Sequence, residues 1–184
     1  MPRKLITTLF YSVNGVAEAP NTFQFDSFDD DLARLMSEAI ASIDTNILGR
    51  VTYQEWAQAF SGPEADPYFG PFINKTRKFV ASRTLAPEDI TWANSELIEG
   101  DLVAFVRELK SSEGGTIAVQ GSLSVVRQLV EAGLIDELTL IIHPVIAGSG
   151  AGLFDGLATT RLKLLSAKAT ERGNILATYA PFEA

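Results

Sequence analysis

The sequence predicts an α/β fold with a mostly parallel mixed sheet, helices on both of its faces and an antiparallel hairpin at its C-terminal end. Strand-sized apolar runs alternate along the chain with segments whose apolar residues recur at helical spacing, a pattern typical of parallel strands joined by helices. The last two strand-like runs, residues 162–170 and 175–180, flank Arg172-Gly173-Asn174, a sequence that favours a hairpin turn. The length of 184 residues indicates a single domain spanning residues 1–184.

The first elements of the chain are a strand, a long loop and a helix. Residues 4–10 are mainly apolar and predict the strand. Residues 12–28 predict the loop, whose length in a compact domain is usually functional or disordered. Three aspartates at 29–31 offer helix-capping chemistry. The residues that then share one helical face are Leu32, Leu35, Met36, Ala39, Ile40 and Ile43.

The middle of the chain contains two short predicted strands and a helix between them. Residues 45–48 predict a buried strand, and the helix is expected to start at Thr52 because Thr52-x-x-Glu55 fits a capping box. Turn-forming residues interrupt the pattern over 61–71. Residues 78–81 predict the second strand, which a polar link containing Pro87 follows.

The third and fourth helices have clear start and stop signals. Asp101 can cap the third helix, and two glycines at 114–115 then turn the chain into a strand over residues 116–119. The fourth helix is expected over residues 122–132, with Gly133 as its stop. The apolar face of the third helix contains Leu102, Phe105, Val106 and Leu109.

After the fourth helix, residues 137–143 are rich in leucine and β-branched residues and predict a strand that Pro144 ends. A glycine-rich loop follows at residues 148–152. We see no internal repeat and no linker between domains.

Composition excludes several classes of function. The formal net charge of −8, from 15 basic and 23 acidic residues, argues against a nucleic-acid surface and means that a phosphate must be bound by a local device. The chain has no cysteine and one histidine, and no cluster of metal ligands stands out. No apolar run approaches the ~20 residues of a membrane span, and no signal peptide is evident. We expect a cytoplasmic protein that binds no nucleic acid, membrane or metal.

Two strand-to-helix turns are the strongest candidates for a ligand site. In residues 48–52, Gly49 permits close backbone approach and Arg50 could grip a phosphate, while the helix start presents free N–H groups. Residues 120–123 repeat the arrangement around Gly121. Each turn by itself more often reflects an ordinary strand-to-helix connection. Together they favour a dinucleotide, which has phosphates at separated points.

Other candidate site residues are few. Ser82-Arg83 forms a third strand end with a hydroxyl and a positive charge, which could bind a phosphate or begin a polar loop. His143 lies on an apolar strand and is more often a core histidine than a proton donor. Asp26 and residues 29–31 are mostly caps or solvated charges. Chemistry supplied by a cofactor fits this scarcity of catalytic side chains.

The sequence resembles the dihydrofolate-reductase-like superfamily over its whole length, and within it the riboflavin-biosynthesis reductase domain, which is the C-terminal domain of bifunctional deaminase-reductases. The resemblance rests on an ordered series of motifs. They are Ser12-Val13-Asn14-Gly15-Val16, Ile47-Leu48-Gly49-Arg50-Val51-Thr52-Tyr53, Val80-Ala81-Ser82-Arg83, Ile117-Ala118-Val119-Gln120-Gly121, Gly133-Leu134-Ile135-Asp136-Glu137-Leu138 and Pro144-Val145-Ile146-Ala147-Gly148-Ser149-Gly150.

The resemblance implies a three-layer fold with a sheet of about eight strands, an NADPH cleft and a homodimer. It assigns the 2′-phosphate side of the cofactor to Gly49, Arg50, Thr52, Ser82 and Arg83. It assigns the pyrophosphate to Gln120, Gly121, Ser122 and Leu123. It places Asn14 and Gly15 over the nicotinamide and makes Asp31 a candidate for orienting the substrate.

Two departures from the family pattern bear on the site. Gln120 stands where the family usually has the first of two glycines, and Asn14 stands where it usually has an aspartate. The function expected from these residues is NADPH-dependent reduction of a small heterocyclic or carbonyl substrate, at a C=N or C=O group, as in the riboflavin-pathway pyrimidine reductase. The alternative is a non-catalytic, dimeric nucleotide- or ligand-binding protein of the same fold.

Overall fold

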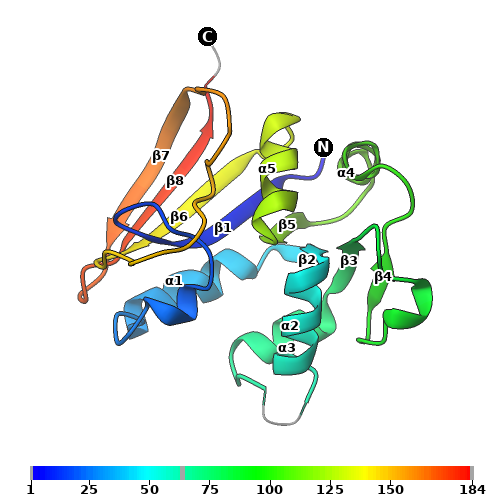
Figure 1. Cartoon of the computed structure of the whole chain (residues 1–184), viewed down its shortest axis with the longest axis horizontal. Helices are drawn as coiled ribbons and strands as arrows, with labels where there is room; N and C mark the ends of the chain where they lie inside the picture. Colours follow the sequence, from blue (N-terminus) through cyan, green and yellow to red (C-terminus); the bar gives the residue numbers. More distant parts are fainter. Residues whose placement is uncertain (1, 63–64, 183–184) are drawn as a thin grey trace.

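One eight-stranded mixed sheet runs through the structure, a computed structural model that describes residues 2–62 and 65–182 (Figure 1). Its strand order is β4-β3-β2-β5-β1-β6-β8-β7. The pairings from β4 to β6 are parallel, and β8 runs antiparallel to both of its neighbours. The strands are β1 (Leu5–Ser12), β2 (Ile43–Gly49), β3 (Arg77–Ala81), β4 (Ser95–Leu97), β5 (Thr116–Gly121), β6 (Glu137–His143), β7 (Leu162–Ala169) and β8 (Ile175–Pro181). The predicted sheet and C-terminal hairpin are confirmed.

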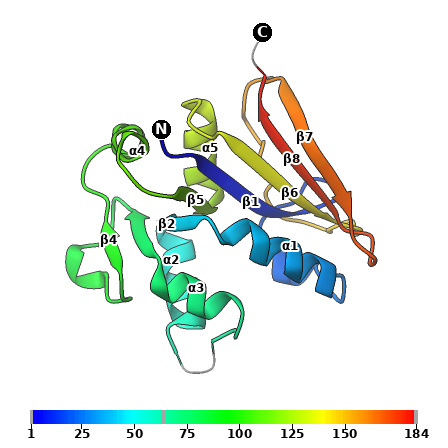
Figure 2. The ribbon, with the colours of Figure 1, turned by 180° about the vertical axis from the view of Figure 1, so that it is seen from behind.

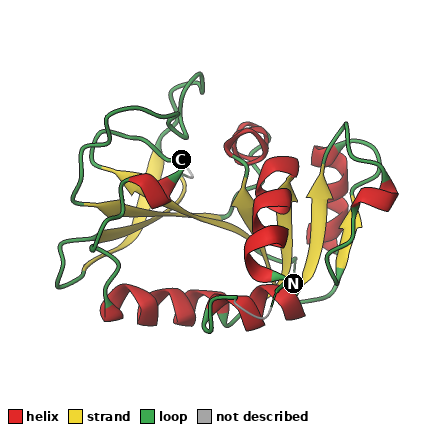
Figure 3. Cartoon of the chain, turned by 60° about the horizontal axis from the view of Figure 1, so that its bottom comes forward, coloured by secondary structure: helices red, strands yellow, loops and turns green. Residues whose placement is uncertain are grey.

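Helices lie on both sides of this sheet, as Figure 3 shows. Helices α4 (Leu102–Ser111) and α5 (Leu123–Glu131) cover one face, which we call the α5 face. Helices α1 (Asp30–Ile40), α2 (Arg50–Phe60) and α3 (Phe69–Lys75) lie on the other, the α1 face. Helix α5 stands in front of β1 in Figure 1 and behind it in Figure 2. Within the described residues, no helix is both long and apolar enough to cross a membrane.

Three helices begin or end where their local sequence predicts. Helix α1 is capped by Asp29, whose carboxylate accepts a hydrogen bond from the Leu32 N–H at 2.8 Å. Asp101 caps α4 in the same way, through the Ala104 N–H at 2.8 Å. Gly133 follows α5 with a φ of +66°, the left-handed conformation that commonly ends a helix. Caps depend on neighbours in the chain, which is why the sequence predicts them well.

The predicted start of α2 is wrong by two residues. The helix begins at Arg50, and Gly49 occupies the N-cap position with an extended backbone (φ −73°, ψ 162°). Thr52 therefore lies inside the first turn, and the expected capping box between Thr52 and Glu55 does not cap this helix. The side chain of Thr52 instead lies beside Gly121 of another strand, a contact that the local sequence does not reveal.

The sequence did not predict two elements of the structure, α3 and β4. Helix α3 falls partly within residues 61–71, which predict turns and of which 63 and 64 lie outside the described residues. Pro71 sits in its first turn, where a helix needs no N–H donor, so it does not break the helix. Strand β4 has three residues, too few to show a period, and it forms by pairing with β3.

The core of the α1 face contains a fully buried lysine, Lys78. Its Nζ donates hydrogen bonds to the carbonyl oxygens of Ile73 (2.7 Å) and Thr76 (2.8 Å) and lies 4.7 Å from the centre of the Trp92 ring. Burial lowers the pKa of Lys78 to about 8. The ammonium group thus satisfies carbonyls at the end of α3, and its charge lies on an aromatic face.

Candidate active site

The carboxyl ends of the parallel strands bring the predicted cofactor residues to one edge of the sheet. Because β3, β2, β5 and β1 are neighbours in that order and all parallel, the segments that follow them are also neighbours. In this order the edge presents Ser82 and Arg83 after β3, Gly49 and Arg50 after β2, Gly121 and Ser122 after β5, and Asn14 and Gly15 after β1. Residues that are distant in sequence thus form one linear series.

The two predicted turns touch each other. A Cβ on Gly49 would lie 2.4 Å from Ser122 Oγ and 2.8 Å from the Ser122 backbone nitrogen. Gly121 has a φ of +130°, and a Cβ there would lie 2.9 Å from Thr52 Oγ1. Any larger residue would therefore collide with the opposite turn. The peptide bond between Gly121 and Ser122 is cis.

Helices α2 and α5 start at this contact without a side-chain cap. Gly49 has no side chain to offer α2, and Ser122, the N-cap of α5, does not bond to its own helix. The Ser122 hydroxyl lies 3.1 Å from the Ser124 hydroxyl instead. Leu123 begins α5 and packs against the core of the α5 face. The first-turn N–H groups of both helices are thus left without a side-chain acceptor at the edge of the sheet, where they can bind an anion.

Positive charge lies on the β2–β3 side of the edge. Arg50 is exposed, and its Nη1 donates to Gln54 Oε1 at 3.0 Å. Arg83 is exposed in the turn after β3. The Ser82 hydroxyl accepts hydrogen bonds from the N–H groups of Thr84 (3.1 Å) and Leu85 (3.0 Å) and thereby fixes this turn. Two guanidinium groups can therefore reach a phosphate there despite the negative charge of the whole chain.

Gln120 lies one residue before the contact between the two turns, and a hydrogen bond to a neighbouring strand holds its side chain. Its Nε2 donates to Oδ1 of the buried Asn46 on β2 at 3.2 Å. Asn46 in turn donates to Thr76 Oγ1 at 2.8 Å. Gln120 is therefore part of a polar chain on the α1 face, while Gly121 and Ser122 form the turn itself.

Asn14 ties the loop after β1 to the glycine-rich loop that follows β6. Its Nδ2 donates to the Ala147 carbonyl at 2.8 Å, and its Oδ1 accepts from the Ala147 N–H at 2.8 Å. The Ser12 hydroxyl also donates to Oδ1 at 2.9 Å. Gly15 follows with a φ of +92°. An aspartate could not donate to the Ala147 carbonyl, which gives a physical reason for an asparagine at this position.

On the α1 face, the central strands near this edge are incompletely covered. Leu9 and Val119 are buried on the α5 face, whereas Thr8, Phe10 and Gln120 of the same two strands are partly exposed on the α1 face. A substrate could therefore reach the sheet from this side. Asp31 lies at the start of α1, and its carboxylate pairs with Arg34 at 3.1 Å.

His143 ends β6 and is a core histidine, as its apolar strand suggests. It is fully buried, its Nδ1 lies 2.7 Å from Ser27 Oγ, and its Nε2 lies 3.4 Å from Gln24 Nε2. Ser27 Oγ donates its own hydrogen to the Gln24 carbonyl at 2.5 Å, so Nδ1 must donate to Ser27. Burial lowers the pKa of His143 and keeps the ring neutral.

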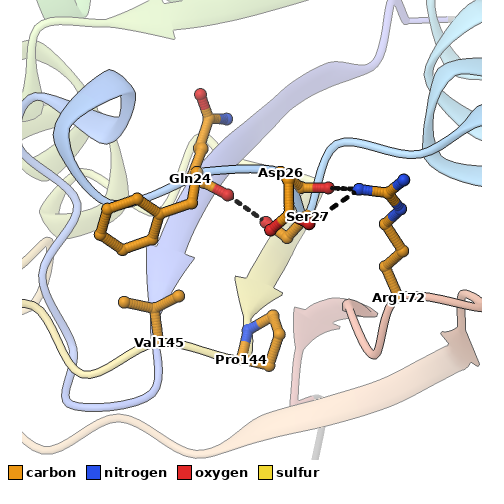
Figure 4. A pocket seen from close by; sticks show the side chains of 7 residues that line it. Gln24, Asp26, Ser27, Pro144, Val145 and Arg172 are labelled. Carbon is orange, nitrogen blue, oxygen red and sulfur yellow. Dashed lines mark hydrogen bonds and ion pairs between the residues drawn. The ribbon is translucent and has the colours of Figure 1, made fainter.

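A pocket of about 330 Å³ opens beside this histidine, between the loop after β1 and the β7–β8 hairpin. Figure 4 shows Arg172 pairing with Asp26 at its mouth, at 3.1 Å. Asn174 donates to the Ser27 carbonyl at 2.6 Å. Local sequence marks Arg172 and Asn174 only as turn residues, because their partners lie more than 140 positions away.

The described part of the chain contains no group of three or more histidine, aspartate or glutamate side chains that could hold a metal ion.

A family model described as the RibD C-terminal domain matches residues 3–176. Among curated relatives, the uncharacterized protein YyaP of Bacillus subtilis is 26% identical over 182 residues, which is 96% of this chain and 94% of that protein.

Solved structures share the fold. A pyrimidine reductase-like protein of Corynebacterium diphtheriae has a TM-score of 0.68 at 18% identity, covering 99% of this chain and 93% of that one. Dihydrofolate reductase of Enterococcus faecalis, solved with NADP(H), has a TM-score of 0.68 at 14% identity, covering 98% and 97%.

A third structure contains an additional region. It is a diaminohydroxyphosphoribosylaminopyrimidine deaminase/5-amino-6-(5-phosphoribosylamino)uracil reductase of Thermotoga maritima, with a TM-score of 0.67 at 13% identity over 98% of this chain and 57% of that one. The fold is thus that of the dihydrofolate-reductase-like proteins, and by its family match the chain belongs to the RibD C-terminal domain family.

Proposed function

We propose that the protein is an NADPH-dependent reductase that transfers hydride to a C=N or C=O group of a small heterocyclic or carbonyl substrate. One observation carries the proposal: guanidinium groups, two touching glycine turns and two uncapped helix starts follow one another along a single sheet edge. Membership of a family whose relatives include reductases supports an oxidoreductase.

The residues at the edge fit a dinucleotide phosphate. Gly49 and Gly121 let the two turns pack against each other, which brings the uncapped first turns of α2 and α5 together at the edge. A pyrophosphate could bind the N–H groups of these first turns. Arg50 and Arg83 would hold the adenosine 2′-phosphate, which distinguishes NADPH from NADH. The bound nicotinamide supplies the hydride. The protein's own task is to hold and orient both reactants.

The substrate would lie on the α1 face, where Thr8 and Phe10 are partly exposed. An aromatic floor at Phe10 suits a planar ring. The Asp31 carboxylate, at the start of α1, would orient polar groups of that ring. The Thermotoga maritima structure is that of a reductase of a substituted aminouracil, which is an example of such a planar substrate.

Replacing Arg50 by alanine tests the assignment of the 2′-phosphate. We expect Arg50→Ala to weaken NADPH binding by about 1.5–3 kcal/mol, or roughly 10- to 150-fold, because a charge-assisted hydrogen bond is lost. NADH binding should change by less than about threefold. Fluorescence titration of both nucleotides with both proteins measures the difference.

Arg34→Ala is the matched control. Arg34 is an exposed arginine whose ion-pair partners among the described residues, Asp31 and Glu38, lie on its own helix. It should leave both affinities within about twofold. If the unmodified protein binds neither nucleotide, the proposed function is wrong.

A second candidate function is nucleotide or ligand binding without turnover. The observation in its favour is that burial lowers the pKa of His143, so this ring is not poised as a proton donor, and that the Asp31 carboxylate is engaged by the exposed Arg34. NADPH binding without oxidation across a panel of pterins, pyrimidines and carbonyl compounds would favour this candidate.

We also propose that the protein forms a homodimer through β7. All eight residues of this edge strand are exposed, among them Leu162, Leu164 and Leu165. An open apolar edge of this length usually pairs with another strand. Light scattering should give twice the chain mass of 19.9 kDa, and Leu164→Lys should shift the protein toward the monomer. A monomer at all concentrations would contradict this proposal.

A further inference from the structure

The loop after β1 is hydrogen-bonded to the glycine-rich loop after β6, beside which it lies (Figure 1). The Val13 N–H donates to the Val145 carbonyl at 2.9 Å. One residue further along, the carboxamide of Asn14 bonds to both the N–H and the carbonyl of Ala147, each at 2.8 Å. A single side chain thus supplies two of the hydrogen bonds that join the loops.

These contacts restrict the residues that can stand at positions 14 and 15. The side chain at 14 must donate to a carbonyl and accept from an N–H, which a carboxamide can do and a carboxylate cannot. Gly15 has a φ of +92°, in the left-handed region that favours glycine. The contact and the turn together therefore require an asparagine directly before a glycine, a pair that occurs at no other place in the sequence.

An asparagine before a glycine is open to a reaction of its own side chain. The Gly15 backbone nitrogen, after losing its proton, attacks Cγ of Asn14 and closes a five-membered succinimide. The Cγ–Nδ2 bond breaks, and ammonia leaves. Water then opens the succinimide at either of its two carbonyls and leaves aspartate or isoaspartate. Glycine favours the attack because it has no side chain to shield its nitrogen.

In the structure, the contacts hold the reacting groups apart from this path. The Gly15 N–H donates to the Ser12 carbonyl at 3.0 Å, so its nitrogen cannot lose the proton without breaking this bond. The Asn14 carboxamide is held by Ala147 at both ends, and the Ser12 hydroxyl donates to its Oδ1 at 2.9 Å. Asn14 is nevertheless an exposed residue, so water reaches it once the two loops separate.

Either product of the reaction removes the contact between the loops. Aspartate cannot donate to the Ala147 carbonyl. Isoaspartate carries the main chain through Cγ and so lengthens the turn that the bond between Gly15 and Ser12 closes. The change is permanent because ammonia is lost.

We infer that Asn14 is a site of spontaneous deamidation, which proceeds only while the loop after β1 is open and then separates it permanently from the glycine-rich loop. The contact with Ala147 therefore suppresses the reaction that destroys it. The rate of the modification is set by how often the loop opens. The inference goes beyond the proposed function and does not depend on nucleotide binding.

Incubation of the full-length protein in mildly alkaline buffer tests the inference. Peptide mass spectrometry of timed samples measures the mass gain of the peptide that contains Asn14, and chromatography separates aspartate from isoaspartate. The same chain unfolded in guanidinium chloride gives the unprotected rate. We expect Asn14 to be the first asparagine to react in the folded protein. Its rate there should be at least about tenfold below the unprotected rate, which corresponds to about 1.4 kcal/mol, or one hydrogen bond.

Hydrogen exchange of the Ala147 amide measures the opening of the loop independently. This N–H donates to Asn14 Oδ1, so the opening that frees Asn14 also exposes the amide to exchange. The factor by which folding slows deamidation should equal the protection factor of the Ala147 amide within about threefold.

Ser12→Ala removes the hydroxyl that donates to Asn14 Oδ1 and accepts from the Val16 N–H at 2.9 Å. It should speed deamidation and Ala147 exchange by the same factor, about three- to tenfold, because hydrogen bonds of the closed loop are lost. Thr22→Ala is the control. The Thr22 hydroxyl is exposed in the same loop and donates to the Ala19 carbonyl at 2.7 Å, so its loss should change neither rate by more than about twofold.

Three results would overturn the inference. The first is an unmodified Asn14 after the time that the Ala147 protection factor predicts. The second is a rate in the folded protein equal to that in the unfolded chain. The third is a Ser12→Ala variant in which deamidation and exchange change by different factors. Because no nucleotide is present, a failure of NADPH binding would contradict the reductase proposal and leave this inference standing.

Discussion

The two halves of the sheet edge differ in how the backbone groups at the strand ends are hydrogen-bonded. Where β2 and β5 end, glycines occupy the turns, and helices α2 and α5 begin without side-chain caps. Where β1 and β6 end, side chains supply the hydrogen bonds. Asp29 caps α1, Asn14 bonds to the Ala147 backbone in both directions, and the His143 ring bonds to the Ser27 hydroxyl.

This difference indicates that the two halves of the edge have different roles. The backbone donors at the starts of α2 and α5 are free of side-chain caps, so the β2–β5 half can accept an anion, as the proposed function requires. The β1–β6 half is internally satisfied and holds the long loop after β1 in place. Substitutions in the β2–β5 half should act by steric clash between the turns, whereas substitutions in the β1–β6 half should act by removing hydrogen bonds.

The largest effect is expected for Gly49→Val. Its Cβ would meet the Ser122 backbone nitrogen at 2.8 Å, an atom that cannot rotate away. We expect the free energy of unfolding to fall by about 2–3 kcal/mol, as for an overpacked site, and NADPH binding to be lost. Urea denaturation and nucleotide titration measure the two effects.

Gly148→Val is the control for this substitution. Nothing lies within 4 Å of a Cβ on Gly148, so its effect should be about 0.5 kcal/mol or less. Equal losses in both variants would mean that close contact between the turns is unimportant.

Asn14→Asp should have a somewhat smaller effect on the other half. The carboxylate cannot donate to the Ala147 carbonyl, so an acceptor would face an acceptor across 2.8 Å. We expect a loss of about 1–3 kcal/mol in urea denaturation at neutral pH. Asn21→Asp, in the same loop but exposed, should change stability by less than about 0.5 kcal/mol. If both variants match the unmodified protein, the loop does not depend on Asn14.

The free energy of unfolding should depend on pH through His143. Burial lowers its pKa in the folded state, so below the ordinary value of 6.5 the unfolded chain binds a proton that the folded chain does not. Stability is therefore fully present above pH 6.5 and is lost as the pH falls from there through the folded pKa, by at most about 1.4 kcal/mol per pH unit.

His143→Gln should abolish this dependence. The chain has no other histidine, so little else titrates between pH 6 and 7. The measurement is urea denaturation of both proteins from pH 7 down to pH 5.5, below the pKa of about 8 of the buried Lys78. An identical slope in the variant would assign the pH dependence to other groups.

Much of the fold follows from local sequence. The strand predicted over residues 137–143 matches β6, and α1, α4 and α5 lie where their apolar spacing predicts, except that Ile43, predicted on the face of the first helix, begins β2. The prediction for Ile43 is wrong because an apolar residue at helical spacing fits the start of a buried strand equally well. Helix α3 escapes this reasoning because Gly70-Pro71 resembles a turn, although Gly70 packs against Ala65 and Pro71 fits a first turn. Strand β4 exists only through its partner β3.

The candidate site is only partly visible in the sequence. Glycines and arginines after predicted strands mark Gly49, Arg50 and Gly121 as candidates. No local pattern shows that Gln120 bonds to Asn46, which lies 74 positions away, or that Lys78 is buried against Trp92. Such polar groups are buried only because distant segments supply their partners.

The sequence by itself determined most of the elements, the caps of α1 and α4 and the glycines at the turns, since propensity, spacing and capping depend on residues within a few positions of each other. Tertiary structure alone decided the strand order and the register. That order makes Gly49 touch Ser122 and lines up Thr8, Thr139, Thr178 and Ser166 across four strands. The reason is physical: pairing between strands is a contact between distant segments, and it is selected by the burial of the whole sheet.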